Sequence, residues 1–121
     1  MIPAPFEVDS DDQDGVRVIA VRGELDLNTA PALETPLDDA LSVSPPTIVL
    51  NLSDCEFIDS TGVALIVRAW QKVSENGSGG NGRFVLCCPN AQVKRLLEIT
   101  GVESTIPMHE TLDEALADAR A

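Results

Sequence analysis

The sequence predicts an α/β domain with a mostly parallel central sheet, an N-terminal β-hairpin and about four helices. Two observations support this class. Short apolar runs rich in β-branched residues alternate with segments whose apolar residues recur every three or four positions, a pattern typical of strands joined by helices. The first two predicted strands follow each other across a short polar turn, which indicates an antiparallel hairpin. The predicted order of elements is ββαβαβαβα.

One domain accounts for residues 1–121, because this length is usual for a single domain and no linker or internal repeat interrupts it. Hydrophobic residues make up 44% of the chain and aromatic residues only 3%, so we expect one core of Val, Leu, Ile and Ala. The three cysteines, Cys55, Cys87 and Cys88, have no disulfide-type spacing. They indicate a reducing cytoplasm, with Cys87 as a core residue and no metal site.

The formal net charge is −12, from 20 acidic and 8 basic residues. Phosphate backbones and anionic lipids would repel such a surface, so we expect no direct binding of nucleic acid or membrane. The first residues lack the basic and apolar regions of a signal peptide, so we expect these residues not to be one. The longest apolar stretch, Val63–Ala69, is far shorter than a membrane span. The expected partners are basic proteins, metals or a nucleotide held by another protein. Alternatively, the acidity serves solubility alone.

The first third of the chain is predicted to form the hairpin and one helix. The hairpin pairs Phe6–Asp9 with Val16–Arg22 across the polar turn Ser10–Gly15. The helix begins at Asn28 or Thr29, which are good capping residues, and Pro31 fits its first turn. A proline inside the helix is expected to kink it or to shift its start. The residues that form this helix pattern are Leu33, Leu37, Ala40 and Leu41, with Pro36 among them.

Next comes the segment with the most chemistry, in which a strand leads into a helix. Thr47–Leu52 is typical of a strand buried on both faces, and a bend is expected at Ser53–Glu56. Ser60 then stands at the N-cap position of a helix that continues from Thr61. Free N–H groups and the positive end of the helix dipole can receive a phosphate on this serine. Alternatively, Ser60 is only a helix cap.

Gly62, in the first turn of that helix, would let another molecule approach the backbone closely. The helix is predicted from an apolar stripe at helical spacing. The members of this stripe are Val63, Ile66, Val67, Trp70 and Val73.

The last third is predicted to contain a flexible loop, two strands and two helices. The loop is Asn76–Gly82, and the strands are Arg83–Cys88 and Ser104–Ile106. One helix opens at Asn90 and ends at Gly101. Thr111 caps the other. The residues expected to face inward from these two helices are Val93, Leu96, Leu97 and Ile99, and then Leu112, Ala115, Leu116 and Ala119.

Four short segments, taken together and in order, resemble the STAS domain family, in particular the bacterial anti-sigma factor antagonists. They are Gly23-Glu24-Leu25-Asp26, Thr29-Ala30, Asn51-Leu52-Ser53 and Phe57-Ile58-Asp59-Ser60-Thr61-Gly62. The resemblance covers nearly the whole chain and implies the STAS fold. The chain departs from the family pattern in the Gly-rich Asn76–Gly82 loop, which resembles an insertion, and in Pro36.

The resemblance also implies a function. In this family a partner anti-sigma factor, a serine kinase that brings its own ATP and Mg²⁺, phosphorylates the serine that corresponds to Ser60. The unphosphorylated antagonist binds the anti-sigma factor, which then releases its sigma factor. A phosphatase that resets the switch is a further candidate partner. The chain itself would need no cofactor.

Six residues of this sequence match family positions on the partner-binding surface: Asp26, Asn51, Asp59, Ser60, Thr61 and Gly62. Each of three polar members also has a structural alternative. Asp26 would be a turn residue, Asn51 would satisfy loop backbone, and Asp59 would set the geometry of the loop before the helix.

Other phosphate-handling or hydrolytic classes fit poorly, so we expect no enzymatic activity. The only histidine, His109, has no nucleophile-elbow serine to serve, and no lysine follows Gly77–Gly82 as in a P-loop. A receiver domain would need an acidic pair after its first strand and a lysine after its last. The acidic residues 11–14 lie in a turn instead, and both lysines, Lys72 and Lys94, fall on helices.

A closer alternative has the same fold without a switch. STAS domains also serve as scaffold subunits of lipid-transport or stress-sensing assemblies, where the same face would be a constant docking surface. Ser60 and Thr61 keep acceptor hydroxyls in this chain. We therefore favour the phosphorylation switch.

Overall fold

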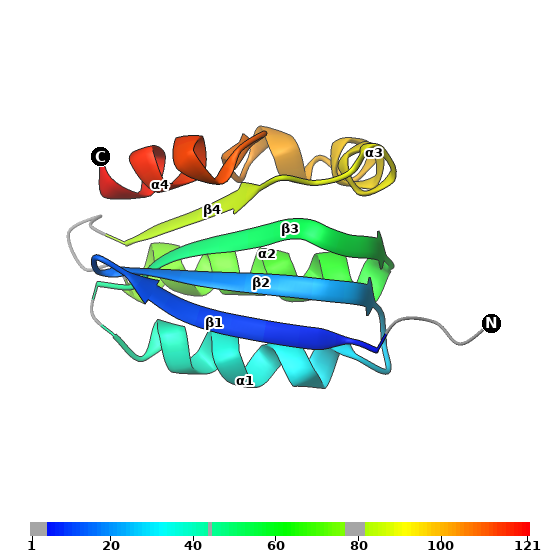
Figure 1. Cartoon of the computed structure of the whole chain (residues 1–121), viewed down its shortest axis with the longest axis horizontal. Coiled ribbons are helices and arrows are strands. Elements are labelled where there is room, and N and C mark those ends of the chain that lie inside the picture. Colours follow the sequence, from blue (N-terminus) through cyan, green and yellow to red (C-terminus); the bar gives the residue numbers. More distant parts are fainter. Residues whose placement is uncertain (1–4, 44, 77–81) are drawn as a thin grey trace.

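The computed structural model describes residues 5–43, 45–76 and 82–121. In this part of the chain five strands, four α-helices and one short 3-10 helix follow one another (Figure 1). They are β1 (Glu7–Gln13), β2 (Val16–Leu25), α1 (Ala30–Leu41), β3 (Thr47–Ile58), α2 (Ser60–Asn76), β4 (Arg83–Cys87), α3 (Ala91–Ile99), η1 (Val102–Ser104), β5 (Met108–His109) and α4 (Leu112–Arg120). This order confirms the predicted ββαβαβαβα arrangement.

The strands form one sheet in the order β1-β2-β3-β4-β5. β1 is antiparallel to β2, and every other neighbouring pair is parallel, as the sequence predicted. The carboxyl ends of β2, β3 and β4 therefore point to the same edge of the sheet (Figure 1). In parallel α/β sheets this edge is where functional loops gather.

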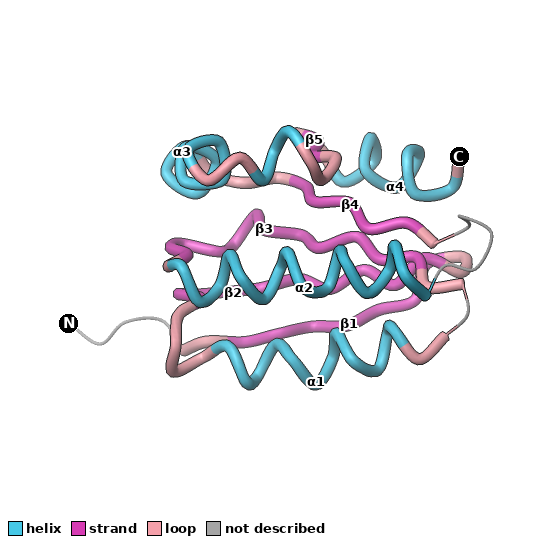
Figure 2. The backbone as a smooth tube through the Cα atoms, turned by 180° about the vertical axis from the view of Figure 1, so that it is seen from behind, coloured by secondary structure: helices cyan, strands magenta, loops and turns pink. Residues whose placement is uncertain are grey.

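Helices cover both faces of the sheet, because the buried strands carry apolar side chains on both sides. α1 and α2 run across one face, as Figure 2 shows, and with α3 they enclose the larger part of the core. α4 packs on the opposite face through Ala115, Leu116 and Ala119, against Val18, Val49 and Val85. Among the described residues no polar or charged residue is buried.

The hairpin is longer than the sequence predicted. β1 continues through the acidic residues to Gln13, and only Asp14 and Gly15 remain as the turn. Both turn residues have positive φ, 56° and 88°, as the tight two-residue hairpin turns require. The prediction of a six-residue turn was wrong because polarity alone does not end an edge strand. A charged, exposed edge strand resists pairing with other chains.

β3 is likewise continuous to Ile58, so the expected bend at Ser53–Glu56 was wrong. The register of β2 against β3 shifts between Ala20 and Arg22 and again between Gly23 and Glu24. These irregularities absorb the extra residues of β3 without ending the strand. Residues Ser53–Glu56, for which a bend was predicted, thus belong to β3, the strand that leads into α2.

Two expectations near the C-terminus also change. β4 ends at Cys87 because Cys88 takes a left-handed conformation, with φ of 66°. The predicted strand Ser104–Ile106 does not form: the chain makes the 3-10 turn η1 there, which positions Ile106 in the core. The last strand is the two-residue β5, too short to leave a periodic pattern in the sequence.

The predicted helix ends are mostly confirmed. Asn90 caps α3 by accepting from the Val93 N–H at 2.8 Å, and Thr111 caps α4 by accepting from the Glu114 N–H at 3.2 Å. Gly101, with φ of 80°, follows the end of α3. The inward position predicted for Ile99 was wrong, since 72% of this residue is exposed.

The two departures from the family pattern have different outcomes. α1 continues from Ala30 to Leu41 with Pro36 inside it. Of the loop predicted at Asn76–Gly82, residues 77–81 lie outside the described residues.

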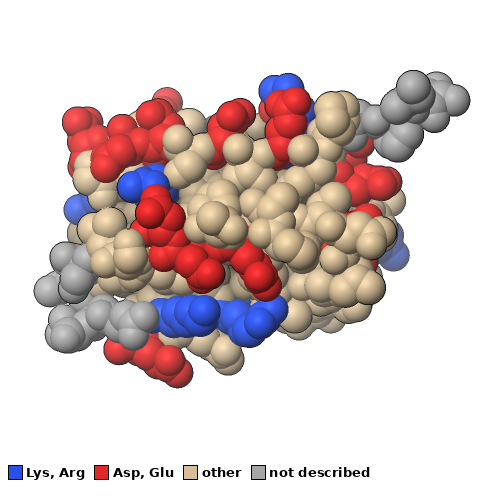
Figure 3. Space-filling view, turned by 90° about the horizontal axis from the view of Figure 1, so that it is seen from below, with Lys and Arg blue, Asp and Glu red and all other residues tan. Residues whose placement is uncertain are grey.

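Charged side chains lie on the outside. The face seen from below in Figure 3 carries a row of Lys and Arg atoms bordered by Asp and Glu atoms. Two long ion pairs join α1 to α2, Arg68 to Glu34 at 3.9 Å and Lys72 to Asp38 at 3.8 Å. Such exposed pairs contribute little to stability. No helix in the described ranges is long and apolar enough to cross a bilayer.

Candidate functional site

The candidate site lies where β2 and β3 end side by side. Leu25 and Ile58 are partners in the parallel register, so the residues that follow them, Asp26 and Asp59, emerge together at the edge of the sheet. The Asp59 N–H donates to the Leu25 carbonyl at 3.1 Å and ties the two strand ends to each other. Ser60 follows at once and opens α2. The structure thus brings these three predicted residues together.

Asp26 organises the loop between β2 and α1. Its carboxylate Oδ1 accepts from the N–H groups of Asn28 at 2.9 Å and Thr29 at 3.1 Å. The Thr29 hydroxyl donates to the Glu24 carbonyl at 2.7 Å and accepts from the Asp26 N–H at 2.9 Å. These bonds hold the loop closed on itself. Half-buried Asp26 is therefore a turn residue, the alternative raised above, that also presents negative charge at this edge.

Asp59, not Ser60, is the N-cap of α2. Its carboxylate Oδ1 accepts from the Gly62 N–H at 3.0 Å, and its carbonyl accepts from the Val63 N–H at 3.0 Å. Ser60 is already the first helical residue, so its predicted N-cap position was wrong by one residue. Aspartate and serine are nearly equal as caps, and the preceding residue, fixed to β2 through its N–H, takes the role.

Ser60 and Thr61 differ in access. Ser60 is exposed and Thr61 is half-buried, and both lie in the first turn of α2. Within the described residues the Ser60 hydroxyl has no hydrogen bond to another side chain or to the backbone. It sits at the positive end of a 17-residue helix and beside the Asp59 carboxylate. The Ser60 side chain is consequently the more accessible of the two to an incoming group.

Gly62 faces inward. A Cβ placed there would lie 2.8 Å from Ile58 Cγ2 and 2.9 Å from Leu25 Cγ, closer than side chains pack. Glycine is needed for the first turn of α2 to approach the ends of β2 and β3. The physical reason for this glycine is internal packing, and its predicted contact with a partner stays a prediction.

Asn51 lies apart from the other predicted residues. It pairs with Ala20 and Cys87 inside the sheet, and its Oδ1 accepts from the Ser53 N–H at 3.0 Å. A strand advances about 3.3 Å per residue, so the eight steps from Asn51 to Asp59 cover about 26 Å. The side chain satisfies local backbone, as the structural alternative stated.

A groove beside the site was missed by sequence reasoning. It has a volume of about 360 Å³ and lies between the end of β3 and α3. We call it the Phe57 groove. It is lined by residues that include Phe57, Ile58, Asp59, Val93, Leu96 and Ile99. The sequence signal was Ile99, which falls off the inward stripe of α3 formed by Val93 and Leu97.

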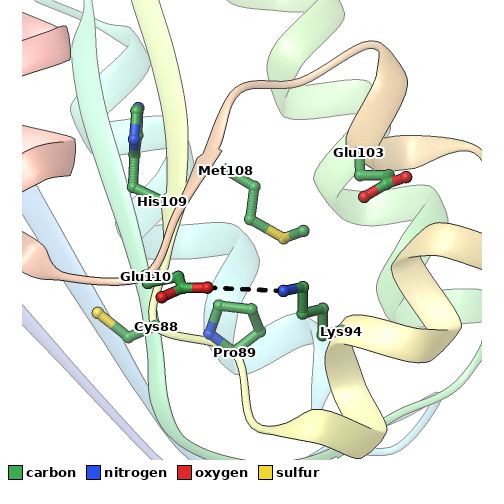
Figure 4. Close-up of a pocket in the computed structure, with 7 residues that line it drawn as sticks. All are labelled: Cys88, Pro89, Lys94, Glu103, Met108, His109 and Glu110. Atoms are coloured by element: carbon green, nitrogen blue, oxygen red, sulfur yellow. Dashed lines mark ion pairs between the residues drawn. The ribbon is translucent and has the colours of Figure 1, made fainter.

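A second cavity, of about 490 Å³, opens beyond the ends of β4 and β5 (Figure 4). Lys94 on α3 reaches across it to Glu110 at 3.8 Å, and Glu103 and His109 also line it. The positive charge of Lys94 is therefore offset by the carboxylates of Glu110 and Glu103. The arrangement therefore offers neither a phosphate cradle nor a matched acid–base pair.

The cysteines are buried or half-buried thiols, all free. Burial raises the pKa of the Cys55 thiol to about 11, so it stays protonated near neutral pH. Burial likewise raises the pKa of Cys87. Neither thiol is a nucleophile under these conditions. In the described ranges no group of three His, Cys, Asp or Glu side chains could hold a metal ion.

Comparison with known proteins identifies the family. The family model of the STAS domain matches residues 7–115. The chain therefore belongs to the STAS domain family, and its sheet, hairpin and four helices are those of STAS structures.

Several bacterial relatives are named as anti-sigma factor antagonists. The anti-sigma-F factor antagonist RsfB of Mycobacterium tuberculosis is 29% identical over 118 residues, which cover 98% of this chain and 93% of RsfB. The crystal structure of an anti-sigma factor antagonist from Mycobacterium paratuberculosis superposes with a TM-score of 0.87 at 34% identity, covering 99% of this chain and 100% of that one. Unphosphorylated SpoIIAA, at 24% identity, shares the fold with a TM-score of 0.73 and covers 96% of each chain.

Proposed function

We propose that this protein is an anti-sigma factor antagonist that is switched off by phosphorylation of Ser60. The observation that carries the proposal is the position of an exposed serine at the start of α2, beside Asp59 and Asp26, in a chain related to such antagonists over nearly its whole length. In this proposal the unphosphorylated protein binds an anti-sigma factor, which then releases its sigma factor. The setting is the cytoplasm, where ATP is available to the kinase.

The proposed partner is a serine kinase as well as an anti-sigma factor. The chain supplies the acceptor hydroxyl, and the partner supplies ATP, Mg²⁺ and the catalytic groups, so this chain is a substrate and not a catalyst. Access favours Ser60 over Thr61, because Thr61 is half-buried and β-branched. A phosphatase that removes the phosphate would complete the cycle. Asp26, Asp59, Thr61 and Gly62 contribute to the docking surface in this proposal.

Electrostatics explains how the phosphate would act. A phosphate on Ser60 adds a charge of about −1.5 to −2 at pH 7. The Asp59 carboxylate already accepts from one of the N–H groups in the first turn of α2, that of Gly62. In a complex that excludes water, a phosphate beside carboxylates is unfavourable, since like charges repel more strongly at lower effective dielectric and lost hydration is not recovered.

The test is to map the phosphorylation site. The protein is incubated with ATP and each serine-kinase anti-sigma factor encoded by its genome, and phosphopeptides are identified by mass spectrometry. We expect one phosphate, on Ser60, that is lost in Ser60→Ala and kept in the matched variant Thr61→Val. Label on Thr61 with Ser60 intact, or no label with any of these kinases, would contradict the proposal and favour the non-switching scaffold.

A further inference from the structure

The exposed large apolar residues of this protein are unevenly placed. In the described ranges they are Leu27, Val43, Phe57 and Ile99, with 70%, 53%, 41% and 72% exposed. Leu27 follows β2, and Phe57 and Ile99 line the Phe57 groove. Only Val43 lies at the opposite end, in the connection from α1 to β3. Apolar surface gathered at one end of a domain marks an interaction site more often than scattered residues do.

The Phe57 groove is continuous with the candidate site. Asp59, which caps α2, also forms part of its wall, and Ser60 is the next residue along the chain. Both walls are fixed. The Asn90 side chain donates to the Cys55 carbonyl of β3 at 3.1 Å and accepts from the Val93 N–H of α3 at 2.8 Å. The groove is thus preorganised, which lowers the entropy cost of filling it.

The lining of the Phe57 groove resembles the central part of a protein–protein interface. Phe57, Leu96 and Ile99 supply the apolar surface, and Asp59 and Arg95 supply a polar rim. Apolar anchors that fill such a pocket, surrounded by polar residues, carry most of the affinity in many protein interfaces.

Charge decides between the possible occupants. The strand ends at this edge carry the carboxylates of Glu24, Asp26, Glu56 and Asp59, and the chain as a whole has a net charge of −12. A second copy would bring the same negative edge against this one, which is unfavourable. A partner with an apolar side chain framed by basic residues matches both the groove and its surroundings.

We propose that the Phe57 groove receives a large apolar side chain of the anti-sigma factor that phosphorylates Ser60. This inference rests on the function proposed above. In this inference the groove provides much of the affinity of the unphosphorylated protein for its partner. It also explains why a phosphate on Ser60 would weaken that binding. A phosphate on Ser60 must stay hydrated, and a partner cannot seal the adjoining apolar groove without removing that water.

The experiment compares Ile99→Ser with Val43→Ser, two exposed apolar residues at opposite ends of the molecule. The binding partner is the purified anti-sigma factor that phosphorylates Ser60, and its affinity for the full unphosphorylated chain is measured by calorimetry. We expect Ile99→Ser to weaken binding about 10- to 100-fold, the loss typical of one buried aliphatic side chain. Val43→Ser should bind as the wild type does, and urea unfolding should show both variants folded.

The outcomes separate the two proposals. Wild-type affinity in Ile99→Ser would overturn the groove proposal and leave the Ser60 switch intact. Equal affinity of phosphorylated and unphosphorylated wild type would overturn the switch, whatever Ile99→Ser does. If no anti-sigma factor of the genome binds the wild type, both are wrong. A wild-type dimer that Ile99→Ser dissociates would show that the occupant is a second copy, against the proposal.

Discussion

At the scale of single residues, the first turn of α2 depends on Asp59 and Gly62. The Asp59 carboxylate holds the Gly62 N–H, and the missing side chain of Gly62 lets the turn rest on Leu25 and Ile58. Ser60 lies between these two fixed residues and faces outward. The proposed acceptor hydroxyl is therefore presented by a well-held turn, although within the described residues the Ser60 side chain makes none of the hydrogen bonds that hold it.

Gly62→Ala should destabilise the protein. Alanine favours a helix by up to about 1 kcal/mol over glycine. Overpacking costs about 1–3 kcal/mol, and here it prevails because the side chains that would have to move, Leu25 and Ile58, are fully buried. Urea unfolding should show a net loss of free energy of unfolding on the order of 1–2 kcal/mol. The exposed neighbour provides the control: Ser60→Ala should change stability by less than about 0.5 kcal/mol. Wild-type stability of Gly62→Ala would show that the turn can move away.

At the scale of elements, α4 is held at its far end by one carboxylate. Asp118 of α4 pairs with Arg83 at the start of β4, and its Oδ2 lies 2.8 Å from His109 Nε2 of β5. The hydrogen bond with His109 and the charge of Arg83 keep the pKa of Asp118 below its ordinary value. The start of β4 and the two C-terminal elements, β5 and α4, thus meet at one side chain.

This arrangement predicts an acid dependence of stability. A carboxyl whose pKa is lowered by folding stabilises the folded state fully above its unfolded pKa of about 3.9 and loses that contribution as the pH falls toward the folded value. Asp118→Asn should therefore lower the free energy of unfolding at pH 6–7, and the difference from wild type should shrink below about pH 4. Asp38→Asn, which removes an exposed partner of Lys72, should have little effect at any pH. Denaturant unfolding at a series of pH values gives the answer, and a pH-independent difference for Asp118→Asn would contradict it.

The order of elements and the place of Ser60 at the start of a helix could be predicted from the sequence, because apolar periodicity and helix caps are local signals. Local signals could not decide whether Asp59 or Ser60 caps α2, because the two are equally good caps and the choice depends on the bond from Asp59 to β2. The Phe57 groove and β5 were also not predicted from the sequence. Both arise from contacts between distant segments, and β5 has only two residues.

At the scale of the whole molecule, the bulk of the hydrophobic core and the candidate site lie in different places. The core lies between the sheet and its helices, whereas the carboxylates, Ser60 and the Phe57 groove gather at one edge. Since no polar or charged residue is buried in the part of the chain that the structure describes, a charge added at that edge meets no buried polar group there. A phosphate there can change what the surface binds while the core is left as it is.

The central claim is that phosphate on Ser60 prevents binding to the anti-sigma factor, and affinity tests it most directly. Calorimetry with the purified anti-sigma factor should compare the unphosphorylated protein, the Ser60-phosphorylated protein and Ser60→Ala. A repulsion and desolvation penalty of about 2–4 kcal/mol predicts binding weakened roughly 30- to 1,000-fold by the phosphate. Ser60→Ala should bind as the unphosphorylated protein does and keep that affinity after incubation with kinase and ATP. Equal affinities of the phosphorylated and unphosphorylated proteins would contradict the claim.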